Sequence, residues 1–188
     1  MSVTAVVLSA KPYMTSWPGL ELLVHHSVIR NAADLQRARF EAALQVRTES
    51  FFFLDDDDAL APGYLEVLAR CEAAAAALTY TDEIVSEADG TQQLVMRHAY
   101  DRAEHFRRPL DIHHLVLCDT AAARRSIQRL PRGHFAPEVM LYWDLARDGA
   151  EYVPGAPYIW NRRPTGMHRW PCTSMSQMRA LLWAKENP

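Results

Sequence analysis

Several features are missing from the sequence, and each absence excludes a class of protein. No apolar run approaches the roughly 20 residues that a membrane-spanning helix needs. The N-terminal stretch lacks the basic region and the long apolar region of a signal peptide, so we expect a cytoplasmic protein. Cysteine is scarce, and Cys71, Cys118 and Cys172 form no CxxC pair, which argues against a disulfide framework and against a cysteine-rich zinc site.

The length and organisation of the chain are typical of one globular domain. A chain of 188 residues is long enough to bury a sizeable core, and the sequence contains no internal repeat and no linker. We therefore expect residues 1–188 to form a single compact domain. Residues 170–188 are expected to form a C-terminal loop and an amphipathic helix.

Charge is distributed unevenly between the two halves of the chain. Residues 1–96 contain 6 Lys or Arg against 14 Asp or Glu, whereas residues 97–188 contain 14 against 9. An acidic half can hold a metal ion and an arginine-rich half can hold an anion, so this pattern is compatible with a metal-bridged phosphate ligand. Ordinary variation of the protein surface explains the pattern equally well.

Strand and helix patterns alternate along the chain. Apolar and β-branched runs predict strands, apolar residues at helical spacing predict helices, and Asn31, Pro62 and Gly63 stand where helices begin. We expect strands at residues 3–9, 21–28, 51–54, 77–85, 92–100 and 151–158, and helices at residues 33–46, 64–77, 119–128, 138–147 and 174–185. The order βαβαβ with short links indicates an α/β sandwich around a mostly parallel sheet.

The most unusual stretch is FFFLDDDDALAPGYLEVL at residues 51–68, in which four aspartates follow a fully apolar strand. Adjacent carboxylates repel one another unless a cation offsets their charge. Open α/β sheets bind ligands beyond the carboxyl ends of their strands, where these aspartates are expected to lie. Alternation puts Asp55 and Asp57 on one side, and hard oxygen ligands suit Mg²⁺ or Mn²⁺. We therefore predict a divalent ion with a bound diphosphate.

Two common acidic motifs fit the stretch poorly. An EF-hand loop that starts at Asp55 requires glycine where Leu60 stands. A haloacid-dehalogenase-like phosphatase also places Asp-x-Asp after an apolar strand, but it requires threonine where Ala59 stands. A solvated surface loop or an adventitious calcium site remains open.

The acidic stretch resembles family 2 glycosyltransferases, in which an apolar strand runs into Leu-Asp-x-Asp-Asp, followed by Pro and a helix that opens with Leu-Glu. The spacing from Leu54 to Pro62 and Leu65 matches that motif without a gap. Residues 4–13 occupy the place of the family's first strand, and residues 137–163 resemble its Glu-Asp pair, helix and final strand leading to an arginine. The resemblance covers most of residues 3–168.

This resemblance implies a GT-A fold, a Rossmann-like three-layer α/β sandwich around a mostly parallel mixed sheet. It also implies metal-dependent transfer of a sugar from a nucleotide-diphosphate sugar to an acceptor hydroxyl, with inversion. By position, Asp57 matches the metal-binding carboxylate, and Asp55 and Asp56 lie where the family contacts the ribose and a metal-bound water. Asp58 extends the motif, either as a ligand or as a helix cap. Glu138 falls on the second acid of the Glu-Asp pair, the general base, with Pro137 as its changed neighbour.

The last residues of the first and second predicted strands, which precede the acidic motif, differ from the family pattern. The second strand closes with His25 and His26, where family members carry acidic residues that read the base. The first strand closes with Ser9. We expect Ser9 and His26 to contact the nucleotide sugar, so that either a histidine and the backbone read the base or the donor is not a uridine nucleotide.

A basic segment, NRRPTGMHRW at residues 161–170, has the Pro and Gly content of a mobile loop over a ligand. The resemblance implies that His168 completes the metal site with Asp57 and that Arg162 stabilises the leaving diphosphate. A solvated basic loop is the alternative.

Two other functions stay open at this point. A nucleotide- or glycan-binding domain without activity would explain the missing acidic residues of the second strand. A nucleotidyltransferase is less favoured, because LSAKPYMTSWPG lacks the glycine-rich, arginine-bearing loop of such enzymes. The acceptor of a transferase is left open between a glycan, a protein, a small molecule and a modified nucleic-acid base, and a homodimer or a partner protein is compatible with so short a chain.

Overall fold

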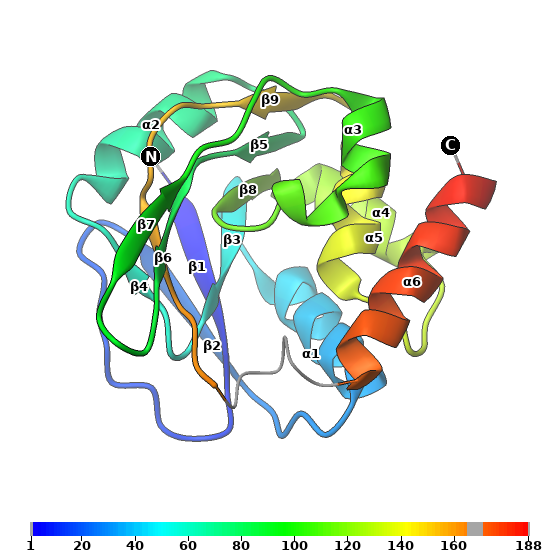
Figure 1. Cartoon of the computed structure of the whole chain (residues 1–188), viewed down its shortest axis with the longest axis horizontal. Coiled ribbons are helices and arrows are strands. Elements are labelled where there is room, and N and C mark those ends of the chain that lie inside the picture. Colours follow the sequence, from blue (N-terminus) through cyan, green and yellow to red (C-terminus); the bar gives the residue numbers. More distant parts are fainter. Residues whose placement is uncertain (1, 165–170, 188) are drawn as a thin grey trace.

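The computed structural model describes residues 2–164 and 171–187, which form two sheets flanked by helices (Figure 1). The six-stranded sheet has the order β2-β1-β3-β8-β5-β9, and the four-stranded sheet has the order β4-β10-β6-β7. The strands are β1 (Val3–Ser9), β2 (Glu21–His26), β3 (Ser50–Asp55), β4 (Ala59–Leu60), β5 (Leu78–Tyr80), β6 (Glu83–Ser86), β7 (Gln92–Val95), β8 (Val116–Asp119), β9 (Ala150–Tyr152) and β10 (Tyr158–Asn161). The helices are α1 (Ala32–Gln45), α2 (Tyr64–Ala73), α3 (Arg102–Arg107), the short 3-10 helix η1 (Pro109–Asp111), α4 (Thr120–Arg129), α5 (Pro137–Leu145) and α6 (Pro171–Glu186).

The six-stranded sheet is parallel except at one strand. β1 pairs in parallel with β2 and β3, and β5 pairs in parallel with β9, whereas β8 runs antiparallel to both β3 and β5. The predicted α/β sandwich around a mostly parallel sheet is therefore confirmed, and β8 makes the sheet mixed. Among the described residues, none of the helices combines the length and the apolar character needed to cross a membrane.

Side chains of the central strands alternate between two apolar cores. Phe51 and Phe53 pack into the core that contains residues of α1, α4 and α5, whereas Phe52 and Leu54 pack into the core on the face of α2. Alternation puts successive side chains of a strand on opposite faces, and a strand covered on both faces is apolar throughout. Figure 1 shows the resulting layers, with α1, α4, α5 and α6 on one side of the sheet and α2 with the β6–β7 hairpin on the other.

Four predicted elements are wrong in extent, one of them the strand expected at residues 92–100, since β7 ends at Val95. The alanine run was expected to continue the helix to residue 77, but α2 ends at Ala73 and Ala75 has a φ of 53°. The strand expected at residues 77–85 is split into β5 and β6, which lie in different sheets. Asp82 stands at the break and accepts hydrogen bonds from the N–H of Arg97 at 2.7 Å and of Gly155 at 3.0 Å, so its side chain fixes the turn between the sheets. The edge strand expected at 151–158 is likewise split into β9 and β10.

A side-chain cap fixes the start of one of the two helices whose starts were predicted. The Asn31 side chain accepts hydrogen bonds from the N–H groups of Ala33 at 2.9 Å and Asp34 at 3.0 Å, which confirms the predicted N-cap of α1. At α2 the N-cap is Gly63, which has a φ of 82° and makes no side-chain cap. Asp58 therefore does not cap α2, and its partners lie elsewhere.

Candidate functional site

The carboxyl ends of three parallel strands place four of the predicted site residues at one edge of the sheet. In the pairing register, Ser9 of β1 lies opposite His26 of β2, and Leu8 lies opposite Asp55 of β3. The Ser9 hydroxyl donates a 2.6 Å hydrogen bond to Asp56 Oδ2, in the turn that follows β3. The structure thus brings Ser9, His26, Asp55 and Asp56 to the same edge, as expected for a ligand site of an open α/β sheet.

Asp58 is the most buried of the four aspartates and is held by β10. The Tyr158 hydroxyl donates to Asp58 Oδ2 at 2.7 Å, and the N–H of Asn161 donates to Oδ1 at 2.7 Å. Burial, and then the charge of Asp55, raise the pKa of Asp58 to about 7. With both oxygens already accepting hydrogen bonds, Asp58 fixes the acidic turn against β10.

Asp55 is paired with an arginine that the sequence pattern alone did not single out. The Arg39 guanidinium contacts Asp55 Oδ1 through Nη2, and its Nε lies 2.9 Å from Glu138 Oε1 as an ion pair. Burial opposes ionisation of Asp55, but the Arg39 charge holds the pKa of this carboxyl below its usual value. Arg39 thereby brings together Asp55, from the predicted nucleotide-sugar contacts, and Glu138, the predicted general base.

Asp57, like Asp55 and Asp56, remains partly open to solvent. Its side chain is 37% exposed, and its Oδ2 lies 3.4 Å from Arg163 Nε. Burial, and then the negative charge of Asp55, raise the pKa of Asp57, while the Arg163 guanidinium opposes that shift. Arg163 is therefore a positive charge standing beside the carboxylate that was predicted to bind a cation.

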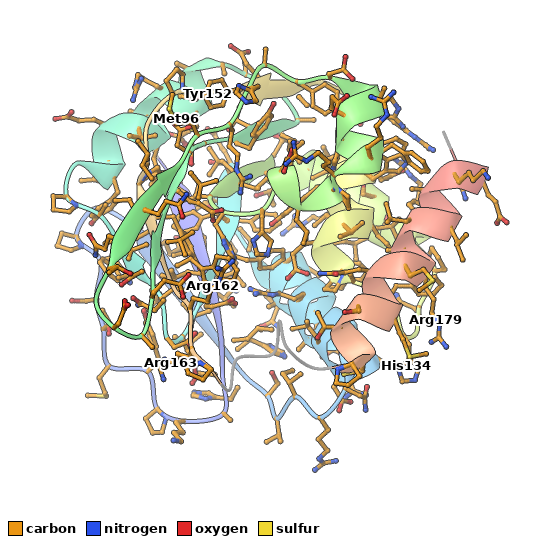
Figure 2. The ribbon with its side chains drawn as sticks, viewed as in Figure 1. Met96, His134, Tyr152, Arg162, Arg163 and Arg179 are labelled. Carbon is orange, nitrogen blue, oxygen red and sulfur yellow. The ribbon has the colours of Figure 1, made fainter. Side chains whose placement is uncertain are left out.

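Arg162 points to a different partner in this structure. Its Nη1 lies 2.9 Å from Glu87 Oε1, and its guanidinium lies 4.6 Å from the centroid of the Trp160 ring. Figure 2 shows Arg162 and Arg163 on the side of the molecule that carries the β6–β7 hairpin, away from α6. The structure thus places both arginines near the acidic edge, but Arg163 rather than Arg162 contacts an aspartate.

The residues around Asp57 fit a hard divalent cation in their donor chemistry. Carboxylate oxygens are the preferred protein ligands of Mg²⁺ and Mn²⁺, and neighbouring acidic charge makes the cation favourable. Asp57 offers such an oxygen on a partly exposed side chain, where a cation would compete with the guanidinium of Arg163. The other predicted metal ligand, His168, lies outside the described residues.

Two further groups of metal-ligating side chains meet under this edge. The ligand atoms of Asp55, Asp58 and His114 lie within 4.8 Å of one another, as do those of Glu83, His113 and His114. Existing contacts already use several of these atoms, since His114 Nδ1 lies 3.0 Å from Glu83 Oε2 and its ring stacks on that of Tyr158 with centroids 4.5 Å apart. We interpret these groups as a buried polar network that supports the acidic turn.

Sequence reasoning missed three residues that organise this site. Arg39 carried a signal, because it stands four positions after Leu35 and three before Ala42, within the apolar stripe of the predicted helix. A charged residue at such a position needs a buried partner. Tyr158 and Arg163 carried no comparable signal, because their contacts with the aspartates depend on how β10 lies beside the turn.

No protein-family model matches the chain, and no curated protein matches its sequence. Solved structures of S. aureus TarS are similar in fold. TarS 1–349 gives a TM-score of 0.60 at 12% sequence identity, over 86% of this chain and 60% of that chain. TarS 1–349 in complex with UDP-GlcNAc gives 0.62 at 12% identity, over 88% and 60%. A further TarS structure gives 0.60 at 11% identity, over 87% and 37%.

This chain therefore spans about 60% of the length of TarS 1–349. At such low identity the similarity is one of fold, and it agrees with the layers and the mixed sheet described above. The chain has the glycosyltransferase-like GT-A fold, which is the fold class expected from its sequence.

Proposed function

We propose that this chain transfers a sugar from a nucleotide-diphosphate sugar to an acceptor hydroxyl, as a metal-dependent enzyme of the family 2 glycosyltransferase kind. The observation that carries the proposal is the meeting of an accessible Asp57, the Ser9–Asp56 pair and the Asp55–Arg39–Glu138 network at one edge of a GT-A sheet. A structure of TarS, which shares the fold, contains UDP-GlcNAc.

The nucleotide of the donor is proposed to lie along the ends of β1 and β2. Ser9 fixes Asp56 by a 2.6 Å hydrogen bond, so the carboxylate keeps one orientation toward the ribose. His26 is exposed at the end of β2, next to Ser9 in the register, where a base would lie. The His26 imidazole or the backbone there would read the base in place of a carboxylate.

Asp57 and His168 would hold Mg²⁺ or Mn²⁺. When bound, the ion supplies positive charge that neutralises the diphosphate as the sugar leaves. Arg163 lies 3.4 Å from Asp57, and Arg162 lies at the adjoining end of β10, so both arginines can add positive charge on the leaving-group side. Charge that is already in place when the leaving group departs lowers the barrier most.

Glu138 is proposed to take the proton of the acceptor hydroxyl. Its carboxylate lies in the first turn of α5 and is held by Arg39, so its free oxygen can face an acceptor while the other is fixed. The acceptor oxygen then attacks the anomeric carbon from the face opposite the diphosphate. A single displacement of this kind inverts the anomeric configuration.

The experiment that tests this function is a thermal-shift screen of UDP, GDP, CDP and TDP sugars, each with and without Mn²⁺. The wild type is compared with Asp57→Ala and with Asp148→Ala, which removes a carboxylate at the opposite end of the sheet. A nucleotide sugar that stabilises the wild type and Asp148→Ala only with metal, and does not stabilise Asp57→Ala, supports the proposal. Absence of any metal-linked shift in the wild type would refute it.

A nucleotide-binding domain without catalysis is the second candidate. The observation that favours it is the ion pair that occupies Glu138 Oε1. Assays of donor hydrolysis and of transfer separate the two functions. Donor binding with turnover that Glu138→Gln lowers to a small residual rate supports the transferase, whereas donor binding without any turnover supports the binding domain.

A further inference from the structure

One buried guanidinium joins the two sides of the proposed active site. Arg39 contacts Asp55 through Nη2 and Glu138 through Nε, and these two carboxylates come from β3 and α5, 83 positions apart in the sequence. We infer that Arg39 is a positioning residue that acts through Glu138, holding this carboxylate at a fixed place relative to Asp55. The inference rests on the proposed function and adds a residue to it.

The surroundings of Arg39 leave its side chain little freedom. The side chain is 7% exposed, and its guanidinium carbon lies 4.6 Å from the centroid of the Phe53 ring, the last aromatic residue of β3. Its neighbours in the helix, Ala38 and Phe40, are buried as well. Because α1 contacts both β1 and α5, Arg39 has a fixed base from which to reach both carboxylates.

Arginine is the side chain that this geometry requires. A guanidinium is planar and presents several N–H groups in fixed directions, so it contacts two carboxylates at once in a defined arrangement. A lysine ammonium in its place is a point charge on a flexible stem and does not fix both partners. Burial lowers the pKa of Arg39, but the charges of Asp55 and Glu138 more than reverse that effect, so the guanidinium stays charged.

The arrangement around Arg39 also lowers the stability of the folded protein. The Nε and Nη1 of Arg39 are both buried and have no hydrogen-bond partner among residues 2–164 and 171–187, so the 2.9 Å contact of Nε with Glu138 is an ion pair without hydrogen-bond alignment. An unsatisfied buried donor lowers stability, and such local costs are expected at functional sites more than elsewhere. The arrangement is therefore better explained by the placement of its two carboxylates than by stability alone.

The Arg39 guanidinium also affects Glu138, the predicted general base. With Arg39 present, Glu138 and Asp55 share one positive charge and keep their separation. Without it, the two carboxylates lose their shared counter-ion, and Glu138 is free to adopt other rotamers. A displacement of a catalytic group by about 1 Å costs about 100-fold in rate. Substitution of Arg39 is therefore expected to lower kcat by about 100-fold, because it displaces the predicted general base.

The test combines Arg39→Lys with Glu138→Gln and uses Arg129→Lys as the matched control. Arg129 is half exposed and forms an ion pair with the buried Asp144, at 2.7 Å, on α4 and α5 outside the site. We expect Arg39→Lys to lower kcat about 100-fold in the otherwise wild-type enzyme. In the Glu138→Gln background it should lower kcat no further and change donor affinity by less than about tenfold, because a positioning residue acts only through its partner. Arg129→Lys should leave kcat unchanged.

Three outcomes would overturn the inference, and they are distinct from failure of the proposed function. Arg39→Lys with wild-type kcat refutes it. A loss of kcat that is the same in both backgrounds, or that parallels a loss of folded protein in circular dichroism, makes Arg39 a structural residue only. A double-mutant cycle of unfolding with Arg39→Met and Glu138→Gln needs no substrate, and absence of coupling there refutes the link by itself. If the wild type neither binds nor turns over a nucleotide sugar, the proposed function fails and Arg39 has no catalytic partner to position.

Discussion

The two ends of the central strand β3 both carry acidic residues, yet they are built differently. At its amino end, a depression of about 710 Å³ is lined by Glu49, Glu72, Asp119 and Asp148. At its carboxyl end stand Asp55, Asp56, Asp57 and Asp58. A hollow therefore lies at the amino end, and the denser charge lies at the carboxyl end.

The carboxylates at the amino end serve local structure. Asp119 Oδ1 accepts from the N–H of Ala122 at 2.7 Å and caps α4. Glu72 accepts a 3.2 Å hydrogen bond from the Ser50 hydroxyl, and Asp148 lies 3.9 Å from Arg125. These are contacts that any surface of an α/β sheet provides, so the hollow alone does not indicate a ligand.

The aspartates at the carboxyl end are instead held by segments far away in the sequence. Asp56 is held by β1, Asp55 by α1, and Asp58 by β10, while Asp57 is paired with Arg163 just beyond β10. A cluster of like charges is costly, and here the fold gives each of the four carboxylates a partner while only Asp58 is buried. The difference between the two ends of β3 teaches that a functional site is identified by the side chains that the fold holds in place, rather than by the size of a cavity.

The largest expected effect follows from removing the carboxylate of Asp57, which is proposed to hold the metal ion. Asp57→Asn keeps the shape of the side chain and removes its charge, so we expect a loss of kcat of about 10²–10³-fold and loss of any Mn²⁺-linked stabilisation by the donor. Asp148→Asn at the amino end is the control and should leave both unchanged. If Asp57→Asn and Asp148→Asn lowered kcat and the Mn²⁺-linked stabilisation equally, the carboxyl end of the sheet would have no special role. Turnover and thermal shift are the measurements.

The elements at the carboxyl end were largely predictable from the sequence. The strand FFFL is apolar at every position because it is covered on both faces, and the aspartates start where burial ends. The edge that collects Ser9, His26, Asp55 and Asp56 follows from parallel pairing of β1, β2 and β3. Local pattern and the rule for open α/β sheets were sufficient for this part.

Other features depend on tertiary contacts that a linear pattern does not record. The split of residues 77–85 into two sheets is fixed by Asp82, whose partners Arg97, Tyr152 and Gly155 lie 15 to 73 positions away. The four residues of β8 were not predicted as a strand, since a short apolar run beside a helix gives no distinct period. The pairing of Arg163 with Asp57 likewise requires β10 to lie beside the turn. The roles of Glu138, His168 and Arg162 stay predictions.

The next effect concerns stability at the carboxyl end. The Tyr158 hydroxyl is fully buried, donates to Asp58 and accepts from the N–H of Asp55 at 3.2 Å. Tyr158→Phe leaves a carboxylate and an N–H without that partner, so we expect a loss of about 2 kcal/mol in the free energy of unfolding. The control is Tyr64→Phe, whose hydroxyl donates to the Pro18 carbonyl nearer the surface, with an expected loss of about 0.5 kcal/mol. Urea denaturation measures both, and equal losses would contradict the special role of Tyr158.

A smaller effect compares two serines at opposite ends of the sheet. Ser9→Ala removes the 2.6 Å hydrogen bond to Asp56, and Ser50→Ala removes the 3.2 Å hydrogen bond to Glu72. A hydrogen bond to a charged group contributes about 1.5–3 kcal/mol, so we expect Ser9→Ala to weaken donor binding about tenfold. Ser50→Ala should leave donor affinity within a factor of about two. Isothermal titration with the donor that the thermal-shift screen selects gives both values, and weaker binding by Ser50→Ala would implicate the amino end.

The smallest effect tests whether the hollow at the amino end contains a reactive thiol. Cys71 lines it and is 2% exposed, and burial raises the pKa of its thiol to about 11. Since the thiolate is the nucleophile, only about one Cys71 in a thousand is reactive at pH 8, and its alkylation by iodoacetamide should be slow and accelerate as the pH rises toward 11. Cys172 is more exposed and should be alkylated first, as read by mass spectrometry of the folded protein. Rapid alkylation of Cys71 at pH 8 would reveal an open, electropositive hollow, and the amino end would then compete with the aspartates as the functional edge of the sheet.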